Sequence, residues 1–292
     1  MFDKTLSIII PAYNEALNIP LVVPSIISFC KQHNYQLIIV NDGSSDNSKQ
    51  LLAEFDNEEC VTTINHKINH GYGGAIKSAI AECQTKYLVT MDCDGQHMVE
   101  DINNLLEQLI ATDADMVVGS RRGLKSASIS RSLGKRIIRF IIKQLMPLPI
   151  YDINSGMKLY RADLGKKYSK ICPNSMAYSD VICLAFINKF HRVVEQPINI
   201  KERKMGQSTV NMKTAFHTIY EIFNIIILFN PIRIFMPIAL VTILAGIAWG
   251  IPIILQGRGV SVGSMLSIMF GTLTLFFAAI AEQLSQIRKR DL

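Results

Sequence analysis

Two long stretches without charge constrain this chain more than any other feature of its sequence. Residues 234–257 and 259–281 contain no Asp, Glu, Lys, Arg or His, and they are 24 and 23 residues long. A bilayer core about 30 Å thick is crossed by about 20 helical residues. The sequence therefore predicts two transmembrane helices, over about 234–255 and 262–281. It excludes a purely soluble, a disordered and a disulfide-stapled secreted protein.

The segments that flank these spans predict their orientation. The loop Gln256–Gly259 is so short that the spans should form a hairpin, within a membrane domain of residues 232–292. The loop carries one positive charge, and the tail carries three at residues 288–290. Basic residues favour the cytosolic side of a membrane. With no signal-peptide pattern at the N-terminus, we expect a multi-pass protein of the inner, or cytoplasmic, membrane whose tail and N-terminal domain are cytosolic.

Residues 1–210 alternate between strand and helix patterns. Short apolar runs, several of them followed by Pro, Asn or Asp, are typical of buried parallel strands. Strands are expected at residues 6–10, 36–40, 61–64, 87–91, 116–118, 157–160 and 193–200, the first stopping at Pro11. Helical patterns lie between most of them, as in βαβ units. The sequence therefore predicts an α/β domain with a doubly wound, mostly parallel sheet that binds ligands at the carboxyl ends of its strands.

The strongest candidate site follows the expected strand at residues 87–91. Asp92 and Asp94 are separated by one residue, and Gln96 adds an amide oxygen. Hard oxygen ligands of this kind suit Mg²⁺ or Mn²⁺, which keep coordination positions for substrate phosphates. An ordinary polar turn with a capping Asp would show the same pattern. The motif alone leaves a metal site and a turn as alternatives.

Two further polar loops follow the first two expected strands. Residues 11–15 read Pro-Ala-Tyr-Asn-Glu, and residues 41–46 read Asn-Asp-Gly-Ser-Ser-Asp. Tyr13 could stack near a nucleobase, and Asp42 could accept hydrogen bonds from its edge. A turn followed by a helix cap would explain each loop as well. Both loops nevertheless stand at the sheet edge where a nucleotide would bind.

A block of positive charge occupies residues 121–143. It holds eight Lys and Arg and no Asp or Glu, in a chain whose net charge is only +6. Within this region, residues 128–146 alternate basic and apolar positions as an amphipathic helix does. Such a helix either covers a core or lies at the membrane surface with its cations toward anionic head groups. The expected spans favour the membrane surface, and residues 211–231 are similarly expected to form an interfacial helix.

The polar motifs together resemble those of a known family. The matching segments are PAYNE (11–15), NDGSSD (41–46), NHGYGGAI (69–76), MDCDGQH (91–97), GSRR (119–122), DINSGMKLYR (152–161) and RKMGQST (203–209). Their joint occurrence over about residues 6–229 is similar to the family 2 inverting glycosyltransferases, which have the GT-A fold. Within that family the chain resembles the branch of dolichol-phosphate mannose synthase. The two-span hairpin resembles bacterial members that glucosylate undecaprenyl phosphate.

This resemblance implies roles for individual residues. The implied donor-binding residues are Pro11, Tyr13, Glu15, Asp42, Gly74 and Asp92. The implied ligands of Mg²⁺ or Mn²⁺ are Asp92, Asp94 and Gln96. The residues implied to grip the acceptor phosphate are Arg121, Arg122, Arg131 and Lys135, and the choice within the basic helix stays open. The residues implied to be catalytic are Asp92, Asp94 and Arg203, the last of which would close over the donor diphosphate.

The implied reaction moves a sugar, with inversion, from a nucleotide sugar to a polyprenyl phosphate such as undecaprenyl phosphate. UDP-glucose is the first expectation for the donor, and GDP-mannose is the second. A phosphate monoester is already ionised at neutral pH, so we expect no essential catalytic base. Asp152 would be the position to watch if a sugar hydroxyl were the acceptor instead. The product would be a lipid-linked sugar for the synthesis or modification of surface glycans.

Other functions and partners fit the sequence less well. A transferase that extends a glycan is an alternative, although the chain lacks the QxxRW signature of processive synthases. A non-catalytic membrane partner in a lipid-sugar pathway is another, although the pair of Asp92 and Asp94 argues against it. Binding of nucleic acid is not expected, because it would leave the spans unexplained. Gly246 and Gly250 form a GxxxG pattern that fits either a homo-oligomer or packing inside the hairpin.

Overall fold

The computed structural model describes residues 4–121, 148–201, 220, 227 and 231–290. Within them the chain divides into two compact units, an N-terminal unit that ends near residue 222 and a C-terminal helical hairpin. The expected basic helix of residues 128–146 and most of the expected interfacial helix of residues 211–231 lie outside the described residues. The same holds for four predicted site residues, which are Arg122, Arg131, Lys135 and Arg203.

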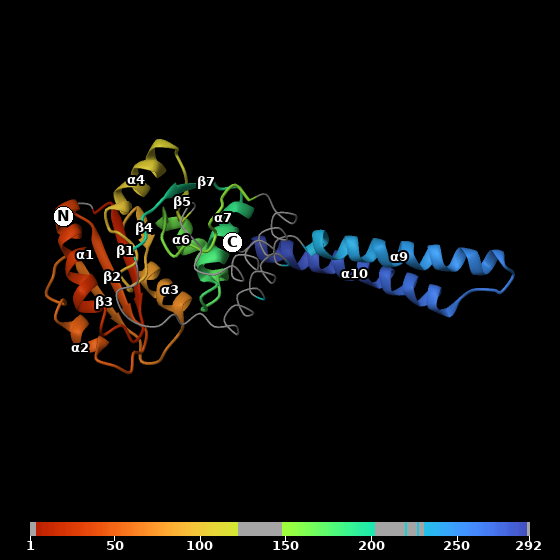
Figure 1. Ribbon diagram of the computed structural model, residues 1–292, viewed down its shortest axis with the longest axis horizontal. Helices are drawn as coiled ribbons and strands as arrows, with labels where there is room; N and C mark the ends of the chain where they lie inside the picture. The colour runs from red at the N-terminus through yellow and green to blue at the C-terminus, as the bar shows by residue number, and fades with distance from the viewer. Residues whose placement is uncertain (1–3, 122–147, 202–219, 221–226, 228–230, 291–292) are drawn as a thin grey trace. The chain divides into compact units, whose positions relative to one another are not determined.

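The N-terminal unit is built on one seven-stranded sheet (Figure 1). Its strands are β1 (Leu6–Ala12), β2 (Gln36–Asn41), β3 (Val61–Asn65), β4 (Tyr87–Thr90), β5 (Met116–Ser120), β6 (Lys158–Arg161) and β7 (Val193–Pro197). Their order across the sheet is β3-β2-β1-β4-β6-β5-β7. All of them run parallel except β6, which pairs antiparallel with β4 and with β5. The expectation of a doubly wound, mostly parallel sheet is confirmed.

Helices cover both faces of this sheet, as a continuous apolar sheet requires. They are α1 (Ile19–His33), α2 (Ser48–Ala53), α3 (Tyr72–Glu82), α4 (Asp101–Ala111), α6 (Ala162–Tyr168), the 3₁₀ turn η1 (Ser169–Ile171) and α7 (Tyr178–Asn188). On one face, Ile26 of α1 and Leu105 of α4 share an apolar cluster with Val89 of β4. On the other, the ring of Phe186 from α7 packs edge-on against Tyr160 of β6 at 5.7 Å.

Several strand boundaries differ from the sequence expectation, and those of β1 and β7 bear on the site. Strand β1 continues through Pro11 to Ala12 rather than stopping before the proline. Pro lacks an N–H, but β4 pairs with β1 only as far as Ile9, so Pro11 interrupts no ladder on that side. Strand β7 ends at Pro197 rather than Ile200, and Ile200 instead forms a bridge with His97, next to the Asp92–Gln96 motif.

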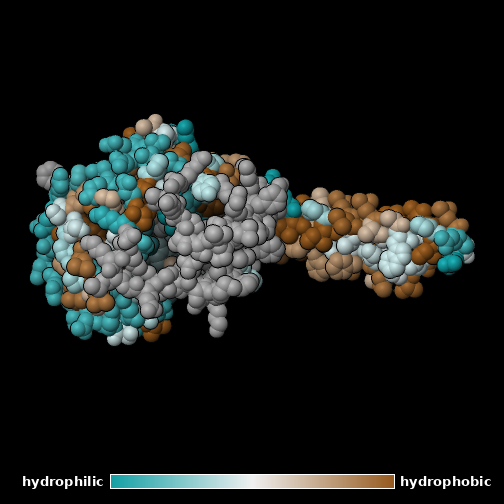
Figure 2. Space-filling model, in the orientation of Figure 1, coloured by the Kyte–Doolittle hydropathy of each residue, from teal (hydrophilic) through white to brown (hydrophobic). Residues whose placement is uncertain are grey.

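The C-terminal unit is a hairpin of two apolar helices, α9 (Pro231–Leu255) and α10 (Val262–Arg290). They contain 25 and 29 residues, which correspond to about 37 and 43 Å of helix, and both are long and apolar enough to cross a membrane. Their surface is predominantly hydrophobic in Figure 2. Helix α10 continues beyond the expected end at residue 281, because helix-forming residues follow it and Gln286 bonds Glu282 one turn back at 3.4 Å.

The hairpin is held by close packing of small residues and by hydrogen bonds between its helices. A Cβ at Gly246 would lie 2.8 Å from the Ile268 side chain, and Gly250 packs against Ser264. The Ser264 hydroxyl donates to the Gly246 carbonyl at 2.6 Å. Small residues and side-chain hydrogen bonds are the usual means of helix association in lipid. The GxxxG pattern therefore serves the packing of α9 on α10 within one chain, which is one of its two alternatives, and a homo-oligomer stays an untested prediction.

Candidate active site

Four strands end at one edge of the sheet. A predicted site residue lies in the end of each strand or within two positions after it. Pro11 lies in the end of β1, Asp42 follows β2, Asp92 follows β4 by two positions, and Arg121 follows β5. Because these strands are parallel, their carboxyl ends share the same edge. The structure thus places these four predicted site residues, which come from four separate motifs, at the same edge of the sheet.

The loops after β1 and β2 are tied into one platform. The Ser45 N–H donates to the Asn14 side-chain oxygen at 2.8 Å, and the Asn14 N–H donates to the Ser44 hydroxyl at 3.0 Å. Asn14 adopts a left-handed conformation with φ of 55°, which Asn tolerates better than most residues. On this platform Tyr13 is 49% exposed, so its ring is available to a ligand. The Glu15 carboxylate accepts a hydrogen bond from the Asn18 amide at 2.6 Å.

Asp42 is buried and organises the neighbouring loop. Its Oδ1 accepts the backbone N–H of His70 at 2.9 Å and lies 2.6 Å from Nδ1 of His66, while its Oδ2 accepts the Gly71 N–H at 2.8 Å. The opposite ring nitrogen of His66 lies 2.9 Å from the Ser78 hydroxyl of α3. A nucleoside contact of Asp42 would have to use the lone pair that Oδ2 retains. His66, just after β3, and Ser78 are the members of this network that lie outside the motifs singled out in the sequence.

The glycines at the start of α3 let another segment of the chain approach closely. The Gly73 N–H donates to the Asn174 carbonyl at 2.8 Å. A Cβ at Gly74 would lie 2.8 Å from the His70 side chain and within 4 Å of the Asn174 side chain. The backbone is therefore closely approached at the NHGYGGAI motif, and the described partner is the segment at residues 173–174. A donor contact of Gly74 remains a prediction.

The Asp92–Gln96 motif forms a compact turn. Asp94 is 8% exposed, and its Oδ1 accepts the Gln96 N–H at 3.0 Å. The turn is completed by Gly95, whose φ of 73° lies in the left-handed region that favours glycine. This is the polar turn that the sequence offered as an alternative to a metal site. The two interpretations are compatible, because a carboxylate oxygen that accepts one N–H retains a further lone pair.

Asp92 is positioned by two residues that the sequence did not single out as site residues. Its Oδ1 accepts a hydrogen bond from the Tyr72 hydroxyl at 3.1 Å. Burial, reinforced by the charge of Asp92, raises the pKa of Tyr72 well above its ordinary value, so the phenol stays protonated and donates. On the other side the carboxylate packs against Gly156, where a Cβ would lie only 2.8 Å from Oδ2.

The donor set fits a divalent ion shared with a substrate. Two carboxylates and one amide are hard oxygen donors, and magnesium is commonly bound by one or two carboxylates together with substrate phosphates. The described residues contain no group of three or more His, Cys, Asp or Glu that could hold an ion by themselves. An ion held by Asp92, Asp94 and Gln96 would have coordination positions left for substrate phosphates.

Arg121 is paired with Asp152 in a bidentate ion pair. Its Nε lies 2.7 Å from Oδ2 and its Nη2 lies 2.8 Å from Oδ1 of the carboxylate. The hydrogen bond to Asp152 raises the pKa of Arg121. Burial pushes the pKa of Asp152 upward, but the hydrogen bonds and charge of Arg121 outweigh it and hold that pKa below its ordinary value. The remaining N–H groups of the Arg121 guanidinium are not bound to Asp152, and its side chain is 35% exposed.

The chain also brings the start of the late basic loop to this edge. The Lys201 N–H donates to the Gln96 carbonyl at 2.9 Å, and the Asn199 N–H donates to the Asp101 carboxylate at 2.8 Å. Lys201 is the last described residue before the range that contains Arg203. The segment with Arg203 therefore starts beside the Asp92–Gln96 motif, as a role on the donor diphosphate requires.

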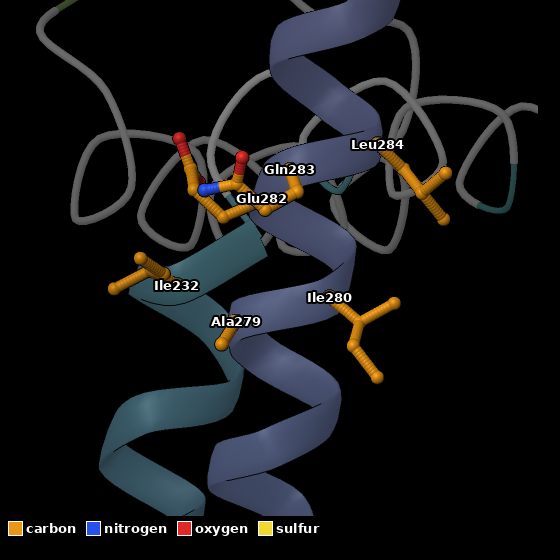
Figure 3. Close-up of a pocket in the computed structure, with 6 residues that line it drawn as sticks. All are labelled: Ile232, Ala279, Ile280, Glu282, Gln283 and Leu284. Carbon is orange, nitrogen blue, oxygen red and sulfur yellow. The ribbon is translucent and has the colours of Figure 1, made fainter.

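A groove on the hairpin differs from this site in its chemistry. Its lining residues are Ile232, Ala279, Ile280, Glu282, Gln283 and Leu284 (Figure 3). Most of these side chains are apolar, and the one charged group among the described lining residues is a carboxylate, which disfavours a phosphate. The groove is no alternative to the strand-end site for a nucleotide or a lipid phosphate.

The contact between Gly156 and Asp92 predicts the result of one substitution. Gly156→Ala would push the Asp92 carboxylate aside, so we expect activity to fall by about 10- to 100-fold, the effect of a shift approaching 1 Å at a reacting centre. The measurement is kcat/KM for sugar transfer. Gly165→Ala is the matched control, because its Cβ would press on Tyr160 at 2.8 Å, away from the site. Full activity of Gly156→Ala, or an equal loss in both variants, would contradict this role.

Comparison with known proteins agrees with the fold and the motifs. Residues 7–169 match glycosyl transferase family 2, and residues 230–287 match the GtrB C-terminal hairpin. A curated relative is undecaprenyl-phosphate 4-deoxy-4-formamido-L-arabinose transferase of Yersinia enterocolitica, 26% identical over 83% of this chain and 73% of its own length. The same enzyme of Photorhabdus laumondii is 27% identical over 75% of this chain and 67% of its own length.

Solved structures share the fold at low identity. Glucosyl-3-phosphoglycerate synthase of Mycobacterium tuberculosis, solved with Mn²⁺ and UDP-glucose, aligns with a TM-score of 0.60 at 13% identity over 76% of this chain and 80% of that one. TarS of S. aureus, solved with UDP-GlcNAc, aligns with a TM-score of 0.56 at 16% identity over 77% of this chain and 66% of that one. Both likenesses concern the GT-A fold. With more than half of its length matched, this chain belongs to glycosyl transferase family 2 and carries the GtrB-type C-terminal hairpin.

Proposed function

We propose that this protein transfers a sugar, with inversion, from a nucleotide sugar to a polyprenyl phosphate such as undecaprenyl phosphate. One observation carries the proposal. The carboxylate pair of Asp92 and Asp94 and the guanidinium of Arg121 follow parallel strands at one sheet edge, in a chain that also has two membrane-length helices. The curated relatives named above use undecaprenyl phosphate, which supports this acceptor. The product would be a lipid-linked sugar for surface glycans.

The platform formed by the first two loops would bind the nucleoside. Tyr13 offers an exposed ring, and the other proposed donor-binding residues of these loops and motifs are Pro11, Glu15, Asp42 and Gly74. UDP-glucose is our first candidate and GDP-mannose the second. The bound UDP sugars of the solved neighbours support a uridine nucleotide. The relatives' names add 4-deoxy-4-formamido-L-arabinose to the sugars that should be tested.

Asp92, Asp94 and Gln96 would hold Mg²⁺ or Mn²⁺ together with the donor diphosphate. A bound divalent ion neutralises charge that develops on the departing phosphate. Arg203 would add a positive charge from the late loop that starts beside Gln96. Both ions have been found with uridine nucleotides in the solved neighbour from Mycobacterium tuberculosis, which supports a divalent metal without choosing between them.

The acceptor would need positioning rather than deprotonation. A lipid phosphate is ionised at neutral pH, and Arg121, with Arg122, Arg131 and Lys135 of the basic block, would hold it. Asp152 is unsuited to act as a general base, because the Arg121 pair lowers its pKa and uses both its oxygens. This geometry supports the expectation that no base is essential.

We propose that residues 1–210 form the cytosolic catalytic domain and that residues 211–231 lie at the membrane surface. Residues 232–292 would then form the membrane hairpin with its basic tail in the cytosol. The distribution of positive charge supports this topology, since the tail carries three basic residues and the connecting loop only Arg258. The site would thus face the leaflet that holds the lipid phosphate.

The decisive experiment is a transfer assay with the full-length protein in detergent. Radiolabelled UDP-glucose, undecaprenyl phosphate and Mg²⁺ or Mn²⁺ are mixed, and label entering the organic phase is measured. We expect transfer that requires the lipid and is abolished by EDTA. GDP-mannose and the other candidate sugar nucleotides are run in parallel to identify the donor.

Each outcome of this assay decides between the alternatives. Label that moves only when a glycan acceptor replaces the lipid would indicate a glycan-extending transferase. If folded protein moves no label from any of these donors, the proposed reaction is wrong, and a non-catalytic role in a lipid-sugar pathway is favoured. Transfer that continues in the presence of EDTA would show that the proposed metal is not required. The proposed lipid-phosphate acceptor would still stand.

A further inference from the structure

Lys158 is a charged residue buried beneath the candidate active site. It belongs to β6, the one antiparallel strand of the described sheet, and is only 1% exposed. Its ammonium donates hydrogen bonds to the Ser155 carbonyl and, over 2.5 Å, to the Ser179 hydroxyl of α7. Burying an ammonium group is costly even when it is hydrogen-bonded. A methionine would fill a similar volume without this cost. Packing alone therefore does not explain a charged side chain at this position.

The bonds of Lys158 converge on a single turn. The Ser155 carbonyl accepts from the ammonium and also from the Ser179 hydroxyl at 2.7 Å. The next carbonyl, that of Gly156, accepts from the Thr90 hydroxyl of β4 at 2.8 Å. Two successive carbonyls are therefore held by side chains from β6, α7 and β4. Such complete satisfaction of buried polar groups fixes one backbone conformation.

This turn, residues 152–156, joins two parts of the candidate active site. At its start Asp152 holds the Arg121 guanidinium through two bonds of 2.7 and 2.8 Å. At its end Gly156 packs against the Asp92 carboxylate. A displacement of the turn would therefore move the group assigned to the acceptor phosphate and a group assigned to the metal at the same time.

Charges around Lys158 come from the same elements. Asp180 on α7 and Asp152 on the turn favour its protonated form, whereas burial and the Arg121 guanidinium favour the neutral form. Burial is the largest of these effects and lowers the pKa of Lys158. The two carboxylates thus oppose the effect of burial and favour the ammonium form, which donates to the Ser155 carbonyl.

We propose that Lys158 is a positioning residue whose ammonium fixes the 152–156 turn and thereby orients Arg121 toward the acceptor phosphate and Asp92 toward the metal. This inference rests on the proposed function. Lys158 would thus contribute to recognition of the lipid phosphate without contacting the lipid phosphate itself. Supporting residues of this kind are commonly worth 10- to 100-fold in activity or metal affinity.

The test is Lys158→Met in the full-length protein, measured in the lipid-transfer assay. We expect kcat to fall by about 10- to 100-fold and KM for undecaprenyl phosphate to rise. The Kd of the donor's nucleoside diphosphate, measured without metal by calorimetry, should stay within about twofold, because the donor loops are held by separate bonds. Ser179→Ala should shift the same parameters less, since the bond from Lys158 to Ser155 remains. Lys166→Met, at an exposed position of α6, is the matched control.

Three results would overturn the inference. The first is a Lys158→Met protein with wild-type kcat and lipid KM. The second is a variant whose only defect is a smaller folded fraction, with normal kinetics per folded molecule. If Lys158→Met does not fold and so fails to bind nucleotide, the Ser179→Ala variant is used as the test instead. The third overturning result is then a Ser179→Ala protein with wild-type kcat and lipid KM. An inactive wild type would instead refute the proposed function, and this inference with it.

Discussion

Replacing Asp94 by Asn should reduce sugar transfer by about a thousandfold. A divalent ion contributes several kcal/mol of charge stabilisation to such a reaction, and each 1.36 kcal/mol is worth about tenfold in rate. The amide keeps an acceptor for the Gln96 N–H, which Asp94 now bonds at 3.0 Å, so the turn should persist. The substitution removes the negative charge and replaces one carboxylate oxygen by an amide nitrogen. The measurement is kcat in the lipid-transfer assay at saturating Mn²⁺ and at saturating Mg²⁺.

The control for this prediction is Asp56→Asn, which removes the same charge at an exposed position after α2. It should leave kcat unchanged. Manganese binding is measured in the presence of the donor diphosphate through the electron paramagnetic resonance signal of the free ion. The affinity for Mn²⁺ should weaken in Asp94→Asn and not in Asp56→Asn. More than a tenth of wild-type activity in Asp94→Asn would show that this carboxylate is not a metal ligand.

The parallel framework is predictable from the sequence because local pattern and topology agree there. Apolar runs without polar alternation indicate strands covered on both faces, and polar residues after them mark the carboxyl edge. Asp92 and Asp94 are found in this way, whereas Arg121 is found through the family resemblance of its GSRR motif, and the structure brings all three to one edge. The two membrane-length helices are equally visible, because an apolar stretch of this length without a single charge is typical of a membrane span.

The supporting residues could not be found from local pattern. Tyr72 reaches Asp92 across 20 positions and Asp152 reaches Arg121 across 31, so only the folded chain brings them together. A lysine is rarely buried in a folded protein, but the antiparallel insertion of β6 between β4 and β5 buries Lys158. The predicted end of β1 is wrong because Pro11 normally stops a strand, whereas here the ladder with β4 has already ended.

Arg121→Lys should lower kcat/KM for undecaprenyl phosphate by about a hundredfold. A lysine keeps the charge but not the planar fork, so it cannot bond both oxygens of Asp152 and present further donors to a phosphate at the same time. The loss should fall mainly on KM for the lipid, because the donor platform around Tyr13 does not involve this pair. Because the pKa of Asp152 is lowered, the pair should persist from neutral to mildly acidic pH and be lost only as pH falls through that lowered value.

A second arginine makes a matched control possible. Arg161 forms the same two-point contact with Asp163, at 3.1 and 2.7 Å, at the end of β6, and both side chains are well exposed. Arg161→Lys should change kinetics little, since exposed ion pairs are worth about 0–1 kcal/mol. The double variant of Arg121→Lys with Asp152→Asn then separates two roles. If Arg121 acts on the phosphate directly, Arg121→Lys raises the lipid KM in the Asp152→Asn background as it does in the wild type. If the effect disappears, Arg121 serves only to hold the 152–156 turn, and its assignment to the acceptor phosphate is wrong.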